Sequence, residues 1–155
     1  MSLPIMSLED VFQEAICHCR HKKKLRDFLK DINIRTYENK TFEEIIIDIN
    51  NKCVHIKGLG LLTIYDITIA ICNYYKVIID KVYIIGGGPK RAIKLLKIKT
   101  QKHIISDKLK INYTNIHTII NAFDENNFEI KNINIRNNKN GDILETYICD
   151  WQKTQ

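Results

Sequence analysis

The sequence predicts a mainly α-helical protein, a compact helical domain organised around two hairpin-like turns. Three observations support this fold class: apolar residues recur at helical spacing, two glycine-rich breaks separate such segments, and 45% hydrophobic with 27% charged residues can bury a core. The length of 155 residues is that of one ordinary domain, so we expect a single domain over residues 1–155. A disordered chain and a large enzyme with separate cofactor and substrate domains are excluded.

The first predicted helix begins after Ser7, whose hydroxyl suits an N-cap and is followed by Glu9 and Asp10 in the first turn. Apolar residues then recur every three or four positions through Cys19, and the stripe resumes after it. We therefore expect one helix to about Lys30.

Two more helices are expected before the middle of the chain. Thr41 and Glu44 have the spacing of a capping box, and the helix they start should end near Asn50 and Asn51. After the break Gly58-Leu59-Gly60, a third helix should run from about Leu61 to Tyr74. The apolar, β-branched run from Val77 to Ile85 fits either a strand or a short buried helix.

The second half begins with a stronger break at Gly86–Pro89, and Pro89 suits the first turn of a following helix. A weaker helix is expected from Thr114 to Phe123, which completes a helical core over residues 7–123. In the C-terminal extension, residues 124–155, Asn140-Gly141 is typical of a tight turn. It is compatible with a small C-terminal β-hairpin between Ile130–Arg136 and Ile143–Cys149.

Positive charge is concentrated in one segment. Between Lys76 and Lys110 there are ten basic and two acidic residues, whereas the rest of the chain is close to balance. Lys90, Arg91, Lys94 and Lys97 recur at helical spacing, which predicts a basic ridge on the helix that follows Gly86–Pro89. The charge favours an anionic partner such as nucleic acid.

Glycines before a helix also suit phosphate contact. They let the backbone approach closely, and the first turn of a helix presents unpaired N–H groups and the positive end of its dipole. None of these groups reads a base, so binding would depend little on nucleotide sequence. We expect at least one positive φ within Gly86–Gly88, because the chain should reverse before Pro89.

The two glycine breaks resemble each other and, together, the tandem helix-hairpin-helix motif of DNA-repair and recombination proteins, over about residues 42–97. The second break matches that motif at Gly86, Gly88, Pro89 and Ala92, with Gly87 in place of its usual apolar residue. The first break keeps Gly58, Leu59 and Gly60 but lacks the proline.

The resemblance implies non-enzymatic binding to nucleic acid, in particular to the DNA phosphate backbone. The residues expected to contact it are Gly86, Gly87, Gly88, Pro89, Lys90, Arg91, Lys94 and Lys97. A secondary hairpin would comprise Lys57, Gly58 and Gly60, although the acidic residues around it make that surface a poor match for DNA.

Three alternatives stay open. The glycine turns could be packing turns beside a solvated basic face. The chain could be a protein-interaction or structural domain, with Trp151, Tyr147 and the segment Ile143–Ile148 as a partner surface. A DNA glycosylase would use Lys90, directly after the hairpin, with Asp107 downstream, but 155 residues are few for that family.

No metal, cofactor or membrane segment is expected. Cys17, Cys19 and His21 invite a metal interpretation, but on one helix Cys19 would point away from the other two. The glycines lack the spacing of a nucleotide-binding loop. Five cysteines, no signal-peptide pattern and no apolar stretch of about 20 residues indicate a reduced, cytoplasmic protein.

Overall fold

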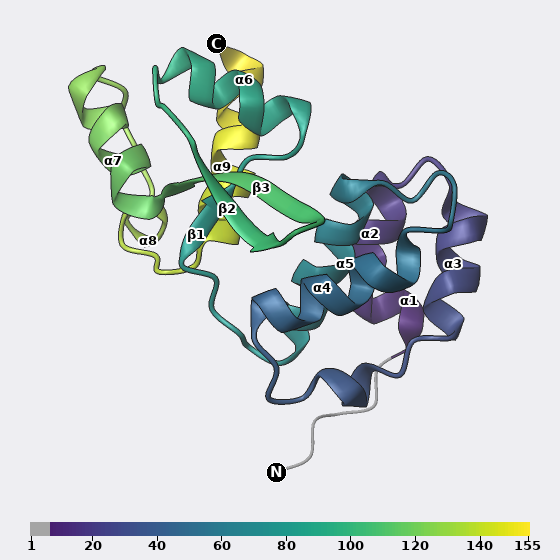
Figure 1. Cartoon of the computed structure of the whole chain (residues 1–155). Coiled ribbons are helices and arrows are strands. Elements are labelled where there is room, and N and C mark those ends of the chain that lie inside the picture. Colours follow the sequence, from purple (N-terminus) through teal and green to yellow (C-terminus); the bar gives the residue numbers. More distant parts are fainter. Residues whose placement is uncertain (1–6) are drawn as a thin grey trace. The chain divides into compact units, whose positions relative to one another are not determined.

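The computed structural model describes residues 7–155, which form helices and one three-stranded antiparallel sheet (Figure 1). The mainly helical class predicted from the sequence is confirmed in this coarse form. The chain divides into two compact units, unit 1 through Val77 and unit 2 from Ile78. Each unit is described by itself.

Unit 1 is helical. Its elements are α1 (Leu8–Val11), α2 (Gln13–His18), α3 (Lys22–Lys30), the 3₁₀ turn η1 (Ile34–Tyr37), α4 (Phe42–Cys53) and α5 (Leu61–Tyr74). Helix α5 packs against α1, α2 and α4, and its long apolar sequence follows from that central position. The capping box of Thr41 and Glu44 is confirmed, and α4 continues past Asn50 and Asn51 to Cys53.

The single N-terminal helix expected to reach Lys30 is wrong. The chain leaves the helical conformation at Phe12 and again at Cys19, which has extended backbone and a buried side chain. The helix end at Cys19 leaves carbonyl groups without a helical partner. The Lys22 ammonium donates to two of them, the oxygen of Cys17 at 3.1 Å and that of Cys19 at 2.7 Å. Tertiary burial of Cys19 thus ends a helix that the apolar spacing alone would continue.

The first glycine break joins α4 to α5. Gly58 has a φ of +100°, a conformation that side chains with a Cβ rarely adopt. A Cβ on it would also lie 2.8 Å from the ring of His21. Gly58 is therefore required both by the turn and by a neighbour that packs against it.

Unit 2 combines the sheet with helices. Its elements are β1 (Lys81–Tyr83), α6 (Gly87–Leu95), β2 (Gln101–Ser106), β3 (Leu109–Asn115), α7 (Ile116–Glu125), α8 (Ile133–Arg136), α9 (Gly141–Trp151) and the 3₁₀ turn η2 (Gln152–Thr154). The strand order is β1-β3-β2, with both pairs antiparallel. The open choice for Val77–Ile85 is resolved as a strand at its centre.

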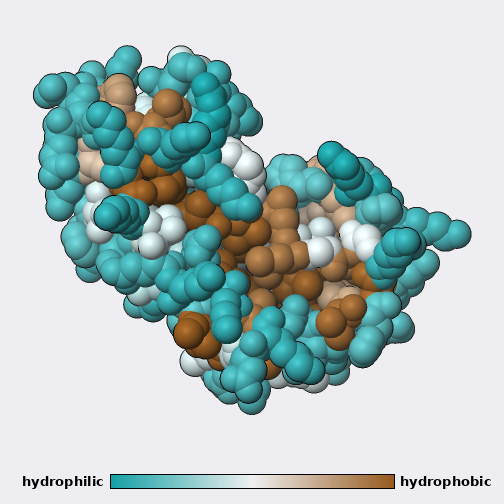
Figure 2. All heavy atoms as spheres, turned by 45° about the horizontal axis from the view of Figure 1, so that its top comes forward, coloured by the Kyte–Doolittle hydropathy of each residue, from teal (hydrophilic) through white to brown (hydrophobic). Residues whose placement is uncertain are grey.

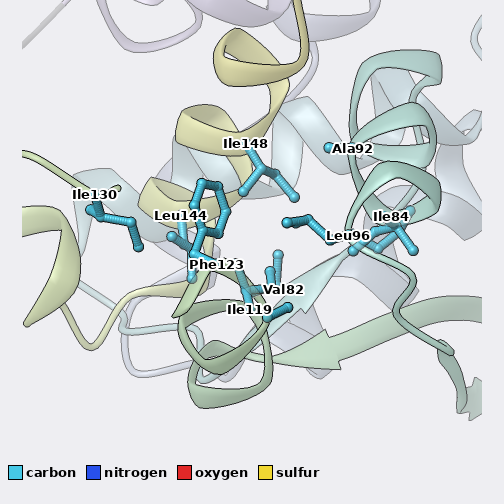
Figure 3. Packing of buried hydrophobic residues seen from close by; sticks show 11 residues of the cluster. Val82, Ile84, Ala92, Leu96, Ile119, Phe123, Ile130, Leu144 and Ile148 are labelled. Atoms are coloured by element: carbon cyan, nitrogen blue, oxygen red, sulfur yellow. The ribbon is translucent and has the colours of Figure 1, made fainter. Parts of the chain in front are cut away.

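The core of unit 2 gathers side chains from β1, α6, α7 and α9 (Figure 3). Its buried members are Val82, Ile84, Ala92, Ile93, Leu96, Ile119, Ala122, Phe123, Ile130, Leu144 and Ile148. Residues 124–155 therefore contribute directly to this core. The same packing holds α6 with its apolar side inward.

The C-terminal β-hairpin is wrong. Ile133–Arg136 and Gly141–Trp151 are helical, and Asn140 is the N-cap of α9, its side chain accepting a hydrogen bond from the N–H of Asp142 at 3.2 Å. The two strands of the real hairpin, β2 and β3, lie earlier in the chain. The turn at Asp107 and Lys108 joins them.

Hydrophilic residues make up much of the surface visible in Figure 2, with apolar residues between them. The most exposed large apolar side chains of the described residues are Val54, Ile78, Ile104 and Ile133, each more than 60% exposed. Within residues 7–155, no helix combines the length and apolar character needed to cross a lipid bilayer.

Candidate nucleic-acid interface

Helix α6 is amphipathic. Pro89, Ala92 and Ile93 are buried on its inner side, and Leu96, its C-cap residue, is buried with them. Lys90, Arg91 and Lys94 are exposed on the outer side, and Lys97 is exposed just beyond the C-cap with a φ of +58°. The four basic residues named from the sequence thus lie on or next to the solvent side of one helix.

Helix α6 follows directly from extended backbone. Gly86 is its N-cap, with φ −77° and ψ 168°, and none of Gly86, Gly87 or Gly88 has a positive φ. The expectation of a positive φ in this turn is wrong, because Gly86 is in extended conformation and Gly87 and Gly88 already belong to α6. The positive-φ glycine of the described residues is Gly58, in the first break.

The order of elements around the two breaks also differs. A helix-hairpin-helix motif joins two helices, and here that order occurs at the first break, between α4 and α5. The second break, which matches the motif better in sequence, joins strand β1 to α6. Its Gly87 is exposed, and the N–H groups of Gly87 and Gly88 donate to no residue between 7 and 155.

Gly88 faces the C-terminal helix, and Pro89 next to it is buried. A Cβ on Gly88 would lie 2.5 Å from the Sγ of Cys149 and 3.5 Å from the side-chain nitrogen of Gln152. Glycine is therefore required at position 88 so that α6 can approach α9. Of the three glycines at this break, Gly87 alone is exposed, and a Cβ on it would meet no other group within 4 Å.

The contact between Gly88 and Cys149 yields a testable expectation. Gly88→Ala should destabilise unit 2 by about 1–3 kcal/mol, because the new methyl group overlaps the thiol. Cys149→Ala removes the sulfur and leaves only its Cβ, 3.7 Å from the added methyl group. The double variant should therefore recover stability, with a coupling free energy of about 1 kcal/mol or more.

Urea unfolding followed by fluorescence of Trp151, the single tryptophan and a residue of unit 2, measures the four variants of this cycle. Additive losses in the double variant would contradict a packing role for Gly88. Recovered stability would support the packing role, and a loss of DNA binding in the stable double variant would show that Gly88 is needed for phosphate approach as well.

Arg91 is engaged with the end of the chain's last helix. One terminal nitrogen of its guanidinium donates to the backbone oxygen and to the side-chain oxygen of Gln152, both at 2.7 Å. The other donates to the backbone oxygen of Gln155 at 3.2 Å. A cation at the C-terminal carbonyls of a helical segment stabilises them, so Arg91 fastens η2 to α6.

The remaining basic residues of this region are not neutralised by neighbours. Between positions 90 and 110 there is one acidic residue, Asp107, and within the described chain no lysine of that stretch forms an ion pair. All of them are exposed: Lys90, Lys94, Lys97, Lys99, Lys102, Lys108 and Lys110. This stretch spans α6, β2 and β3.

The secondary hairpin is a weaker candidate for an anion-binding site, because most of its groups contact the start of α3. The carbonyl oxygen of Lys57 accepts a hydrogen bond from the Lys24 ammonium at 2.9 Å, and Gly58 packs against His21. Gly60 is the exposed N-cap of α5, with open space where a Cβ would be. The turn therefore has a structural explanation in its contacts with the start of α3.

Cys17, Cys19 and His21 do not lie on one helix, so the predicted helix through these residues is wrong. Helix α2 ends at His18, Cys19 is buried in extended backbone, and His21 precedes α3. Across residues 7–155 no three His, Cys, Asp or Glu side chains are grouped so as to hold a metal ion. Burial raises the pKa of the Cys53 thiol to about 12 and also raises that of Cys149, which disfavours reactive thiolates there.

The proposed partner surface of the interaction-domain alternative is partly internal, although Ile143 is 45% exposed. Ile148 is fully buried, and the Trp151 ring lies 4.8 Å from that of Phe123 and 5.1 Å from that of Phe128, centroid to centroid. These aromatic residues close the core of unit 2. The two residues of the glycosylase alternative, Lys90 and Asp107, are exposed in α6 and in the turn between β2 and β3.

Unit 1 contains a shallow polar pocket of about 320 Å³, lined by Thr36, Tyr37, Lys40, Glu44, Asp48 and Lys52. Its central groups satisfy one another: the Tyr37 hydroxyl donates to Asp48 at 2.5 Å, and the Lys52 ammonium lies 2.8 Å from the same carboxylate oxygen. Burial, then the hydrogen bond to Asp48, raises the pKa of Tyr37. A tyrosine held neutral in this way is poorly suited to act as a nucleophile or base.

Burial works against ionisation of Asp48, but hydrogen bonds from Lys52 and Tyr37 outweigh it and hold the pKa of that carboxyl below its usual value. The Asp48 carboxylate of α4 thus connects η1 to α4 through its hydrogen bond from Tyr37. The chemistry of the pocket is accounted for by this structural role.

The chain was also compared with known proteins. No family model matches it, and no significant match is found among curated proteins or solved structures.

Proposed function

We propose that unit 2 is a non-enzymatic, largely sequence-independent nucleic-acid-binding module, with DNA as its natural ligand. The observation that carries this proposal is the set of exposed lysines on and beside α6, Lys90, Lys94 and Lys97, none of which forms an ion pair with a described residue. When unpaired lysines neutralise phosphates, the counterions held by the DNA are released, and this release drives binding.

The N-terminus of α6 supports the same surface. Gly87 is exposed, its N–H has no acceptor within residues 7–155, and Lys90 lies one turn further along. A phosphate near Gly87 would meet both an unpaired N–H group and the positive end of the helix dipole. Arg91 is not expected to contact phosphate directly, because its guanidinium already donates hydrogen bonds to Gln152 and Gln155.

The test is a titration of fluorescently labelled DNA, single-stranded and duplex, followed by anisotropy. The unmodified protein should bind in the micromolar range at about 50 mM salt and lose affinity steeply by about 200 mM. Lys90→Glu combined with Lys94→Glu should weaken binding about tenfold or more on every sequence alike, because two phosphate contacts become repulsive.

The matched control is Lys131→Glu combined with Lys139→Glu. These lysines are also exposed, also lack a described ion-pair partner, belong to the same unit and give the same change in charge. The control variant should bind almost as well as the unmodified protein. Absence of binding at low salt, or equal loss in both double variants, would contradict the proposed site.

A further inference from the structure

One face of the sheet in unit 2 also carries exposed lysines, Lys102 and Lys110. In the register of β3 with its neighbours, Val82 pairs with Thr114, Lys102 with Asn112, and Ile104 with Lys110. Because alternate residues of a strand point to the same side, all six side chains lie on one face. Val82 and Thr114 are buried, whereas the other four are exposed.

Helix α6 lies on that same side of the sheet. Val82 packs in the unit 2 core with Ala92 and Leu96 of α6, as Figure 3 shows. The core therefore covers the β1 end of this face and leaves the β2–β3 ribbon uncovered. Lys102 and Lys110 of the ribbon are therefore exposed on the side of the sheet on which α6 lies, and α6 carries its own exposed lysines, Lys90 and Lys94.

The aromatic residues of the sheet lie on the opposite face and bind one another. Tyr83, with its hydroxyl 2.9 Å from the Nδ1 of His103, is almost fully buried. The Tyr113 hydroxyl donates to Gln101 at 2.7 Å, and the Lys81 ammonium lies 5.5 Å from the centre of the Tyr113 ring. These rings are occupied by intramolecular contacts.

The lysine-bearing face accordingly lacks what single-strand binders use. Such proteins stack bases on exposed aromatic rings beside a basic groove. The exposed residues of this face are Lys102, Ile104, Lys110 and Asn112, and those of α6 with large side chains are Lys90, Arg91, Lys94 and Leu95. Two sets of exposed lysines without a ring to stack on suit two phosphate backbones on either side of a groove.

We infer that the exposed face of the β2–β3 ribbon is a second contact surface, and that the ligand of unit 2 is a nucleic-acid duplex rather than a single strand. This inference rests on the proposed function of α6. The ribbon binds one backbone through Lys102 and Lys110, while α6 binds the other. Asn112, beside Lys102, adds a neutral hydrogen-bond donor to phosphate.

The experiment compares the full chain with Lys102→Ala combined with Lys110→Ala, using a labelled DNA duplex and each of its separated strands. The unmodified protein should bind the duplex at least about tenfold more tightly than either strand. In the variant, the plot of log affinity against log salt on the duplex should become less steep, its negative slope shrinking in magnitude by about 2, since each lost phosphate contact removes about 0.9. Lys131→Ala combined with Lys139→Ala should leave the slope unchanged.

The outcomes separate the two proposals. If the Lys90→Glu and Lys94→Glu variant loses binding while the ribbon variant keeps the full salt slope, the ribbon surface is wrong and the proposed function stands. Equal or tighter binding of a single strand overturns the duplex assignment. If the unmodified protein binds neither form, both proposals fail.

Discussion

Gly141→Ala should destabilise unit 2 by about 3 kcal/mol or more, one of the two largest effects expected for this protein. The N–H of Gly141 donates to the Ile79 carbonyl oxygen at 2.6 Å, which holds the start of α9 against β1. An added Cβ would lie 2.5 Å from the carbonyl carbon of Lys81 and closer still to its oxygen. Both groups are backbone, so neither can turn away as a side chain would.

The measurement is urea unfolding followed by Trp151 fluorescence. Gly87→Ala is the matched control, because a Cβ there meets nothing within 4 Å and alanine favours the helix. The control should keep or slightly raise the free energy of unfolding. A Gly141→Ala protein within about 1 kcal/mol of the unmodified one would contradict the close approach of α9 to β1.

Phe123→Ala should lower the free energy of unfolding of unit 2 by about 3–5 kcal/mol. The ring is fully buried at the end of α7, with Phe128, Tyr147 and Trp151 packed around it at centroid distances between 4.8 and 6.1 Å. Removing it leaves a cavity between α7 and α9. Since α6 packs on the same core, the loss should also weaken the proposed DNA binding at temperatures near the new melting point.

Ile133→Ala is the comparison for this variant. Ile133 is 61% exposed in α8, so its truncation should change stability by no more than about 0.5 kcal/mol. Because Phe123 touches Trp151, far-UV circular dichroism should be recorded beside fluorescence, and the two midpoints should agree. A similar, small effect of both substitutions would mean that Phe123 is not enclosed by the C-terminal helix.

Sequence signals that act within a few residues were sufficient to predict several helices. The capping box at Thr41 and the apolar spacing after Gly60 predicted α4 and α5, and the structure confirms the span Leu61–Tyr74 as expected from the sequence. Pro89 in the first turn of α6 likewise agrees with the structure. In each case the capping or spacing signal lies within the element or at the residue directly before it.

Two elements of the structure, β3 and α9, carry periodic signals that the sequence prediction did not use. Leu109, Ile111 and Tyr113 alternate with polar residues, a period-2 pattern that predicts strand β3. In α9, Leu144, Tyr147, Ile148 and Trp151 recur at helical spacing, which competes with the hairpin signal of Asn140-Gly141. Asn is a good N-cap as well as a turn residue, so the dipeptide alone does not decide between hairpin and helix start.

The sequence alone predicted the helical class, the position of the lysine-rich segment and the exposed basic residues of α6. It did so because charge and amphipathic spacing are properties of neighbouring residues. Three relationships are visible only in the folded protein: Gly88 packs against Cys149, Arg91 binds Gln152, and Lys102 lies on the same sheet face as Lys110. Such contacts join residues distant in the chain or set by strand register, which folding fixes through burial and pairing.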